Sequence, residues 1–134
     1  MEELQVRDAI VAYLVAGLDA DPLDVPVVYD NMPFDWNDPP PAFVQVEIKF
    51  YDGTQIGASA NPRTRLHGYI YITSTVREGT GGREPLRIKG HVSDILKYAR
   101  FSGVQLGEPS PDGTSTTKGW YYDSTKIRFF ADPT

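Results

Sequence analysis

The sequence predicts one α+β domain over residues 1–134, in which an antiparallel β-sheet of strands of mixed length carries two helices on one face. Apolar residues recur with helical spacing near the start of the chain and again after its middle. Segments that alternate between apolar and polar residues lie between and after these two stretches. Because several strands follow one another without an intervening helix, antiparallel pairing is favoured, and a chain of 134 residues has room for one core.

The first expected element is a helix over residues 2–18. Its apolar stripe repeats every four residues and comprises Val6, Ile10, Leu14 and Leu18. The stripe is expected to be widened by Leu4, Val11 and Val15. A short strand over 25–29 follows, and then a segment over 31–41 that contains four prolines. We expect this segment to be a stiff loop held in place by Phe34 and Trp36.

The middle of the chain predicts two strands joined by a long hairpin loop or arm. Residues 43–50 alternate cleanly, and so does a second strand over about 65–76. In the second strand the tyrosines at 69 and 71 are expected to face outward. The intervening residues 51–64 are rich in glycine, serine, asparagine and proline, and are too many for a tight turn.

A second helix is expected over about 85–100, with Leu86 in its buried stripe and Lys89 outside. After it we expect a strand over 104–107, a mobile loop over 108–118 and a last strand over 120–130. This last strand has aromatic residues on both faces. One face is therefore expected to meet the core and the other a partner.

Composition narrows the classes of function. The chain has no cysteine, which excludes disulfides, thiolate metal ligands and cysteine nucleophiles. Its net charge of −5 argues against a nucleic-acid-binding domain, which normally carries a positive excess. No apolar run approaches the roughly 20 residues of a membrane span, and the first residues do not resemble a signal peptide.

Charge is unevenly distributed along the chain. Residues 1–54 have 11 acidic and 2 basic side chains, whereas residues 55–100 have 3 acidic and 8 basic ones. A chain that is acidic in one part and basic in another can pair with copies of itself head to tail. Solvation of both charged faces would explain the same pattern.

The motifs that carry chemistry are weak, so we expect no catalytic, cofactor-binding or metal-binding residues. Asp19, Asp21, Asp24 and Asp30 do not form a calcium loop, because the sixth position is Asp24 rather than glycine and the twelfth is not glutamate. His67 and His91 lack the spacing of a metal site. Two alternatives stay open: a small enzyme or ligand-binding domain that uses the Gly79–Gly82 loop, and a nucleic-acid binder that uses the basic segment 63–100.

Aromatic and cationic side chains on the polar faces of strands are the best candidates for a function, because tyrosine and arginine are enriched at the centres of protein interfaces. The expected interface residues are Tyr51, Arg63, Arg65, Tyr69, Tyr71, Arg77 and Tyr122.

Several segments, taken in order, resemble the tail-terminator and tail-completion proteins (minor tail proteins) of long-tailed bacteriophages and prophages. They are Val6-Arg7-Asp8-Ala9-Ile10, Tyr29-Asp30-Asn31-Met32-Pro33-Phe34, Phe43-Val44-Gln45-Val46, Gly68-Tyr69-Ile70-Tyr71-Ile72, Arg77-Glu78-Gly79-Thr80-Gly81 and Gly119-Trp120-Tyr121-Tyr122. The resemblance covers nearly the whole chain, apart from 51–64 and 108–118.

The resemblance implies a structural role in virion assembly and no enzymatic activity. Such proteins form a ring, usually hexameric, that caps the tail tube, stops its polymerisation and presents the surface that joins the head. The implied partners are further copies of the chain, the tail-tube protein and a head-completion or connector protein, with DNA only as cargo passing through the ring and no membrane. The implied location is the head-proximal end of the virion tail, and the host cytoplasm during assembly. A related head–tail connector or tail-tube component is the neighbouring alternative.

Overall fold

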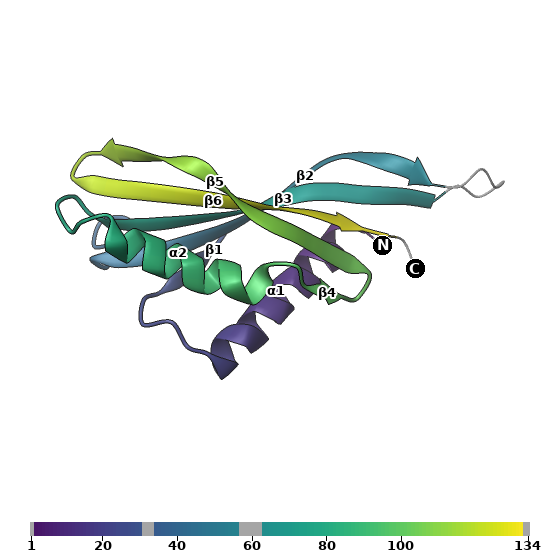
Figure 1. The fold of residues 1–134 in the computed structure, drawn as a ribbon, viewed down its shortest axis with the longest axis horizontal. Helices are drawn as coiled ribbons and strands as arrows, with labels where there is room; N and C mark the ends of the chain where they lie inside the picture. Colours follow the sequence, from purple (N-terminus) through teal and green to yellow (C-terminus); the bar gives the residue numbers. More distant parts are fainter. Residues whose placement is uncertain (1, 31–33, 57–62, 133–134) are drawn as a thin grey trace.

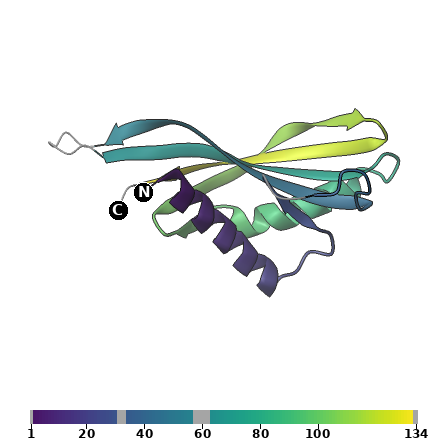
Figure 2. The ribbon, with the colours of Figure 1, turned by 180° about the vertical axis from the view of Figure 1, so that it is seen from behind.

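The chain folds into a six-stranded sheet with both helices on one of its faces (Figures 1 and 2). The computed structural model describes residues 2–30, 34–56 and 63–132, with side chains for all of these except 52–56, 63 and 64. The elements are α1 (Glu3–Ala20), β1 (Val27–Tyr29), β2 (Ala42–Ile56), β3 (Arg63–Arg77), α2 (Arg83–Leu96), β4 (Arg100–Phe101), β5 (Val104–Thr117) and β6 (Trp120–Ala131). The strands lie in the order β1-β2-β3-β6-β5-β4.

The predicted α+β class with two helices on one face is confirmed, with one difference in the sheet. All described strand pairs are antiparallel except β1 and β2, which run parallel, with Val27 opposite Val44. Because β1 and β2 are parallel, the chain returns to the end of the sheet where β1 begins before it enters β2. Backbone hydrogen bonds from Val44 to Pro26 and from Asp30 to Val46 fix the pairing.

The core lies between the helices and the sheet face they cover. It is built almost entirely from aliphatic side chains that alternate along the strands, with the buried stripes of both helices packed on them. Its members from the helices are Val6, Ile10, Leu14, Ile88, Val92 and Leu96, and those from the sheet include Val44, Val46, Ile70, Ile72, Leu106, Ile127 and Phe129.

Helix α1 confirms the stripe of Val6, Ile10, Leu14 and Leu18 and ends two residues beyond the predicted boundary. Leu4 and Val15, expected to widen the stripe, are instead 65% and 41% exposed. At its start Glu2 and Gln5 form a capping box, in which the Glu2 amide donates to Gln5 Oε1 at 2.9 Å.

Helix α2 differs from the prediction in length and orientation. It ends at Leu96 because Tyr98 adopts a left-handed conformation with φ of 58°, so the expected helical residues 97–100 instead lead into β4. Leu86, expected inside, is 57% exposed. Lys89, expected outside, is buried, because its ammonium group meets a buried carboxylate, Asp123.

The two long hairpins differ from the expected loops. β2 continues to Ile56 and β3 starts at Arg63, so most of the expected loop 51–64 is a strand arm with a bulge between Tyr51 and Thr54. Residues 57–62 lie outside the described part.

The prediction of a mobile loop over residues 108–118 was wrong. β5 runs to Thr117 and pairs with β6 through two register shifts. Its prolines, Pro109 and Pro111, are accommodated because a strand at the edge of a sheet needs few ladder donors.

Candidate functional site

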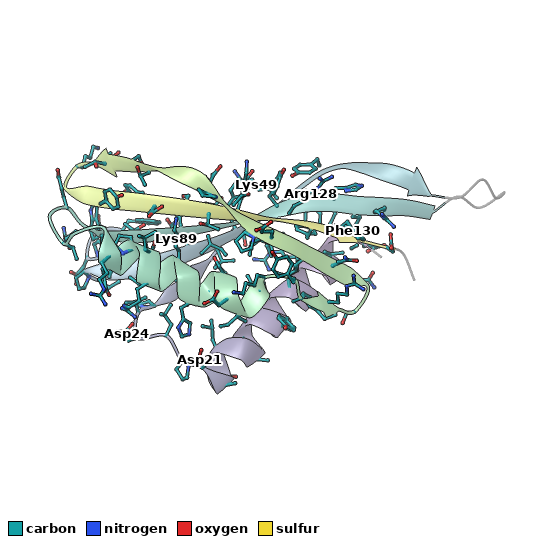
Figure 3. The ribbon with its side chains drawn as sticks, in the orientation of Figure 1. Asp21, Asp24, Lys49, Lys89, Arg128 and Phe130 are labelled. Carbon is teal, nitrogen blue, oxygen red and sulfur yellow. The ribbon has the colours of Figure 1, made fainter. Side chains whose placement is uncertain are left out.

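The candidate site is the face of the sheet that lies opposite the helices, called the outer face below. Alternation along β2, β3 and β6 places Lys49, Tyr69 and Arg128 side by side on it, because Lys49 pairs with Tyr69 and Tyr69 with Arg128. Figure 3 shows Lys49 and Arg128 on the side of the sheet away from α1 and α2. The next rung joins Glu47, Tyr71 and Lys126 in the same way.

Three tyrosines form a connected group at the centre of the outer face. The ring centroids of Tyr51 and Tyr69 lie 5.2 Å apart, and those of Tyr69 and Tyr71 lie 6.0 Å apart. Lys126 Nζ lies 5.1 Å from the Tyr69 ring centroid, and Lys49 Nζ lies 5.3 Å from that of Tyr71. Cations at this distance from aromatic rings are attracted to them, so the group presents ordered aromatic surface beside positive charge.

A hollow of about 290 Å³, called the basic hollow below, adjoins this group where β3, β6 and β5 lie together. Arg65, Arg128 and Phe130 are among the residues that line it. Asp132 accepts hydrogen bonds from Arg65 Nε at 2.6 Å and Nη2 at 3.2 Å, while the guanidinium lies 4.4 Å from the Phe130 ring centroid. Arg65 is therefore held in one orientation. Arg128 is exposed and has no ion-pair partner among the described side chains, so its charge is available to a partner.

Aromatic side chains close the other end of the outer face. Phe34 and Trp36 both contact Phe43, with centroid separations of 4.8 and 6.0 Å, which confirms that these two residues hold the described part of the predicted segment, residues 34–41. Residues 31–33 lie outside the described part. Phe43 also contacts Trp120, and the guanidinium of Arg77 lies 4.0 Å from the Trp120 ring centroid.

Those sequence-predicted interface residues whose side chains are described lie on this one face but do not form one cluster. Tyr51, Tyr69 and Tyr71 contact one another, whereas Arg65 lies toward the arm. Arg77 and Tyr122 lie at the opposite end, opposite Trp120 and Thr75 in the strand register. The side chain of Arg63 lies outside the described part.

Four residues that complete the central group and the basic hollow are absent from the predicted interface: Lys49, Lys126, Arg128 and Phe130. The sequence pattern alone could have indicated them, because alternation along each strand places them on the same face as the predicted tyrosines. Their proximity depends on β6 lying next to β3, a pairing between segments about fifty residues apart.

The Gly79–Gly82 loop borders a separate hollow of about 290 Å³ beside Val76 and Tyr121. Gly79 and Gly81 have positive φ angles of 91° and 99°, which explains glycine at both positions. Among the described residues no cluster of three or more His, Cys, Asp or Glu side chains is arranged to hold a metal ion. None of the helices in the described part is both long enough and apolar enough to cross a membrane.

Comparison with solved structures shows where this fold occurs. A structure that bears no functional name matches the whole chain with a TM-score of 0.72 at 14% identity, over 98% of its own length. A sheath/tube terminator of an extracellular contractile injection system, solved in the extended state by cryo-electron microscopy, matches the whole chain with a TM-score of 0.54 at 12% identity. The present chain spans 57% of that terminator. No protein-family model and no curated protein matches the chain. The likeness therefore establishes a shared fold.

Proposed function

We propose that this protein is a structural subunit of a phage-type tail, forming a ring that terminates the tail tube, stops its polymerisation and provides the surface to which the head joins. The observation that carries the proposal is that the whole chain matches the fold of a sheath/tube terminator. This protein's distinctive surface chemistry supports it independently. Tyrosine and arginine gather on the outer face of the sheet, and these residue types dominate the energetics of protein interfaces.

A ring requires two different surfaces on each copy, because each subunit meets its neighbours through a heterologous contact. The outer face supplies one such surface. It is rigid, since its side chains stand on the long central strands β2, β3 and β6. Ordered aromatic side chains lose little conformational freedom on binding, so they suit a contact that must form repeatedly around a ring.

The proposal is tested with purified protein and the cognate tail-tube protein. Mass is measured by light scattering, and tube length and tube ends are examined by negative-stain electron microscopy. We expect rings at tube ends and tubes of uniform length. A chain that stays monomeric and leaves tube length unrestricted would overturn the proposal. A chain that binds tubes without limiting their length would indicate the neighbouring connector or tube-component role.

A matched pair of variants connects assembly with the outer face. Tyr71→Ala removes an aromatic ring from the centre of that face, and Leu86→Ala removes an exposed apolar side chain from α2 in the helix layer. We expect Tyr71→Ala to reduce ring formation at least tenfold and Leu86→Ala to leave it unchanged. Circular dichroism and thermal unfolding of both variants establish that the fold is retained. If the two variants reduced ring formation equally, the outer face would not be the surface through which the subunits assemble.

A further inference from the structure

The end of α1 and the segment after it carry three exposed carboxylates on the opposite side of the molecule from the outer face. These residues, Asp19, Asp21 and Asp24, are called the acidic tip below. The side chains of Asp21 and Asp24 are 77% and 70% exposed. In Figures 1 and 3 the end of α1 points away from the sheet, and Asp21 and Asp24 lie on the side of the helix layer away from the sheet.

These three carboxylates contribute little to the stability of the folded chain. A helix C-terminus carries a partial negative charge and favours cations, yet the last turn of α1 has no basic residue. Within the chain, Asp21 lies 3.6 Å from His91 Nε2 and Asp24 lies 3.0 Å from Arg87. Arg87 also donates to Glu84, and this hydrogen bond is the main reason that the pKa of Glu84 is lowered. One guanidinium is thus shared by two carboxylates, and the tip keeps a negative excess.

The basic hollow and the acidic tip differ in charge and in form. The carboxylates of the tip are exposed whereas the hollow is concave, and Arg128 at the hollow lacks a described ion-pair partner. Arg65 is already oriented by Asp132 and Phe130, so little conformational freedom is lost when a further carboxylate approaches.

We propose that the acidic tip of one copy docks in the basic hollow of the next copy, with the tyrosine group around the contact. This inference rests on the proposed ring function and assigns the contact that joins neighbouring subunits. Because tip and hollow lie on opposite sides of the chain, each copy meets two different neighbours. Such a contact is heterologous, and it produces a closed ring when the rotation between neighbours closes.

Charge reversal tests the contact in the full-length protein, under the conditions in which the wild type forms rings, alone or on tubes. One variant is Arg128→Glu and the other carries Asp19→Lys with Asp21→Lys. Each alone places like charges across every contact, so we expect at least a tenfold rise in the concentration needed for half-assembly. An equimolar mixture should recover rings, because in an alternating ring every contact joins opposite charges.

Matched controls reverse exposed charges elsewhere in the helix layer. Arg83 lies at the start of α2 and Asp8 lies on α1, and both side chains are exposed. The variants Arg83→Glu and Asp8→Lys should assemble as the wild type does. The tip variant should unfold at the same temperature as the wild type or a higher one, since lysine suits a helix C-terminus. A loss of assembly in that variant is then not a loss of folding.

Cross-linking separates a ring from a two-fold pair. The chain has no cysteine, so Asp21→Cys with Arg128→Cys introduces one thiol in the tip and one at the hollow. The two positions lie on opposite sides of one copy, too far apart for an intramolecular disulfide. Oxidation should give a ladder of covalent multimers that ends at the ring size. Dimers alone, or no cross-links, would overturn the proposal.

The two proposals fail in different ways. Wild-type rings that are unaffected by both charge reversals would overturn the tip-to-hollow contact and leave the terminator function standing. A wild type that forms no ring, alone or with the tube protein, would overturn both.

Discussion

Lys89 Nζ lies 2.6 Å from Asp123 Oδ1 beneath α2, and the two side chains are only 10% and 9% exposed. The pair joins α2 to β6 inside a predominantly apolar core (Figure 3 labels Lys89). Beside it, the hydroxyl of Ser74 donates to the carbonyl of Pro85 at 2.7 Å and lies 3.3 Å from that of Asp123. These polar contacts fix the position of α2 on the sheet, so they also fix the position of the Gly79–Gly82 loop that precedes it.

Removing one member of this buried pair should destabilise the protein strongly. We expect Lys89→Met to lower the free energy of unfolding by about 3–5 kcal/mol, because Asp123 is left charged and buried without a partner. Lys89→Met combined with Asp123→Val should recover much of this loss, since no buried charge remains. Denaturant unfolding followed by circular dichroism measures both. Lys97→Met, in an exposed pair with Asp94, is the control and should change the free energy by less than about 1 kcal/mol.

Sequence patterns predicted most of the elements because their apolar periodicity reports directly on burial. They failed at Lys89, since a lysine is rarely buried and its partner, Asp123, comes from a strand 34 residues further on. They failed at β5 for a similar reason. Residues 108–117 are rich in proline, glycine, serine and threonine, and only pairing with β6 makes them a strand. For the site, strand parity predicted that Tyr69, Tyr71 and Tyr122 share the outer face, whereas Tyr51 was expected in a loop and lies in β2. The basic hollow depends on the β3–β6 and β5–β6 pairings.

Gly68 is required by close packing in the centre of β3. A Cβ atom at this position would meet the carbonyl oxygen of Lys49 and the ring of Phe129 at less than any normal contact distance. Gly68→Ala should therefore lower the free energy of unfolding by about 1–3 kcal/mol, because strand backbone or the buried ring has to move. Gly90→Ala is the matched control. Gly90 lies in α2 with open space around it, so this change should stabilise the protein by up to about 1 kcal/mol. Thermal and denaturant unfolding of the two variants should thus shift in opposite directions.

Tyr29 should make stability depend on pH in the alkaline range. Its pKa is raised above the ordinary value of 10.0, first by burial and then by the negative charge of Asp19. The phenol ionises more readily in the unfolded chain, so its contribution is complete below pH 10 and is lost as the pH rises through the folded-state pKa. Wild type should therefore lose stability above about pH 10 more steeply than Tyr29→Phe, a comparison that cancels the other tyrosines. Parallel slopes for the two proteins in urea titrations would contradict this assignment.

The prolines of β5 should protect an open sheet edge. β4 pairs only with Val104 and Gln105, so β5 beyond these residues has no described strand on its outer side. Pro109 and Pro111 lack amide donors, and a strand edge that lacks donors is a poor template for further strand pairing. We expect Pro109→Thr with Pro111→Thr to aggregate faster on mild heating, as measured by light scattering and thioflavin fluorescence, while its unfolding midpoint changes little. Ser115→Thr, at an exposed position further along the same strand, adds β propensity without restoring a donor and is the control. Equal aggregation rates for wild type and the double proline variant would show that the edge is protected by other means, such as the charges of Glu108 and Asp112.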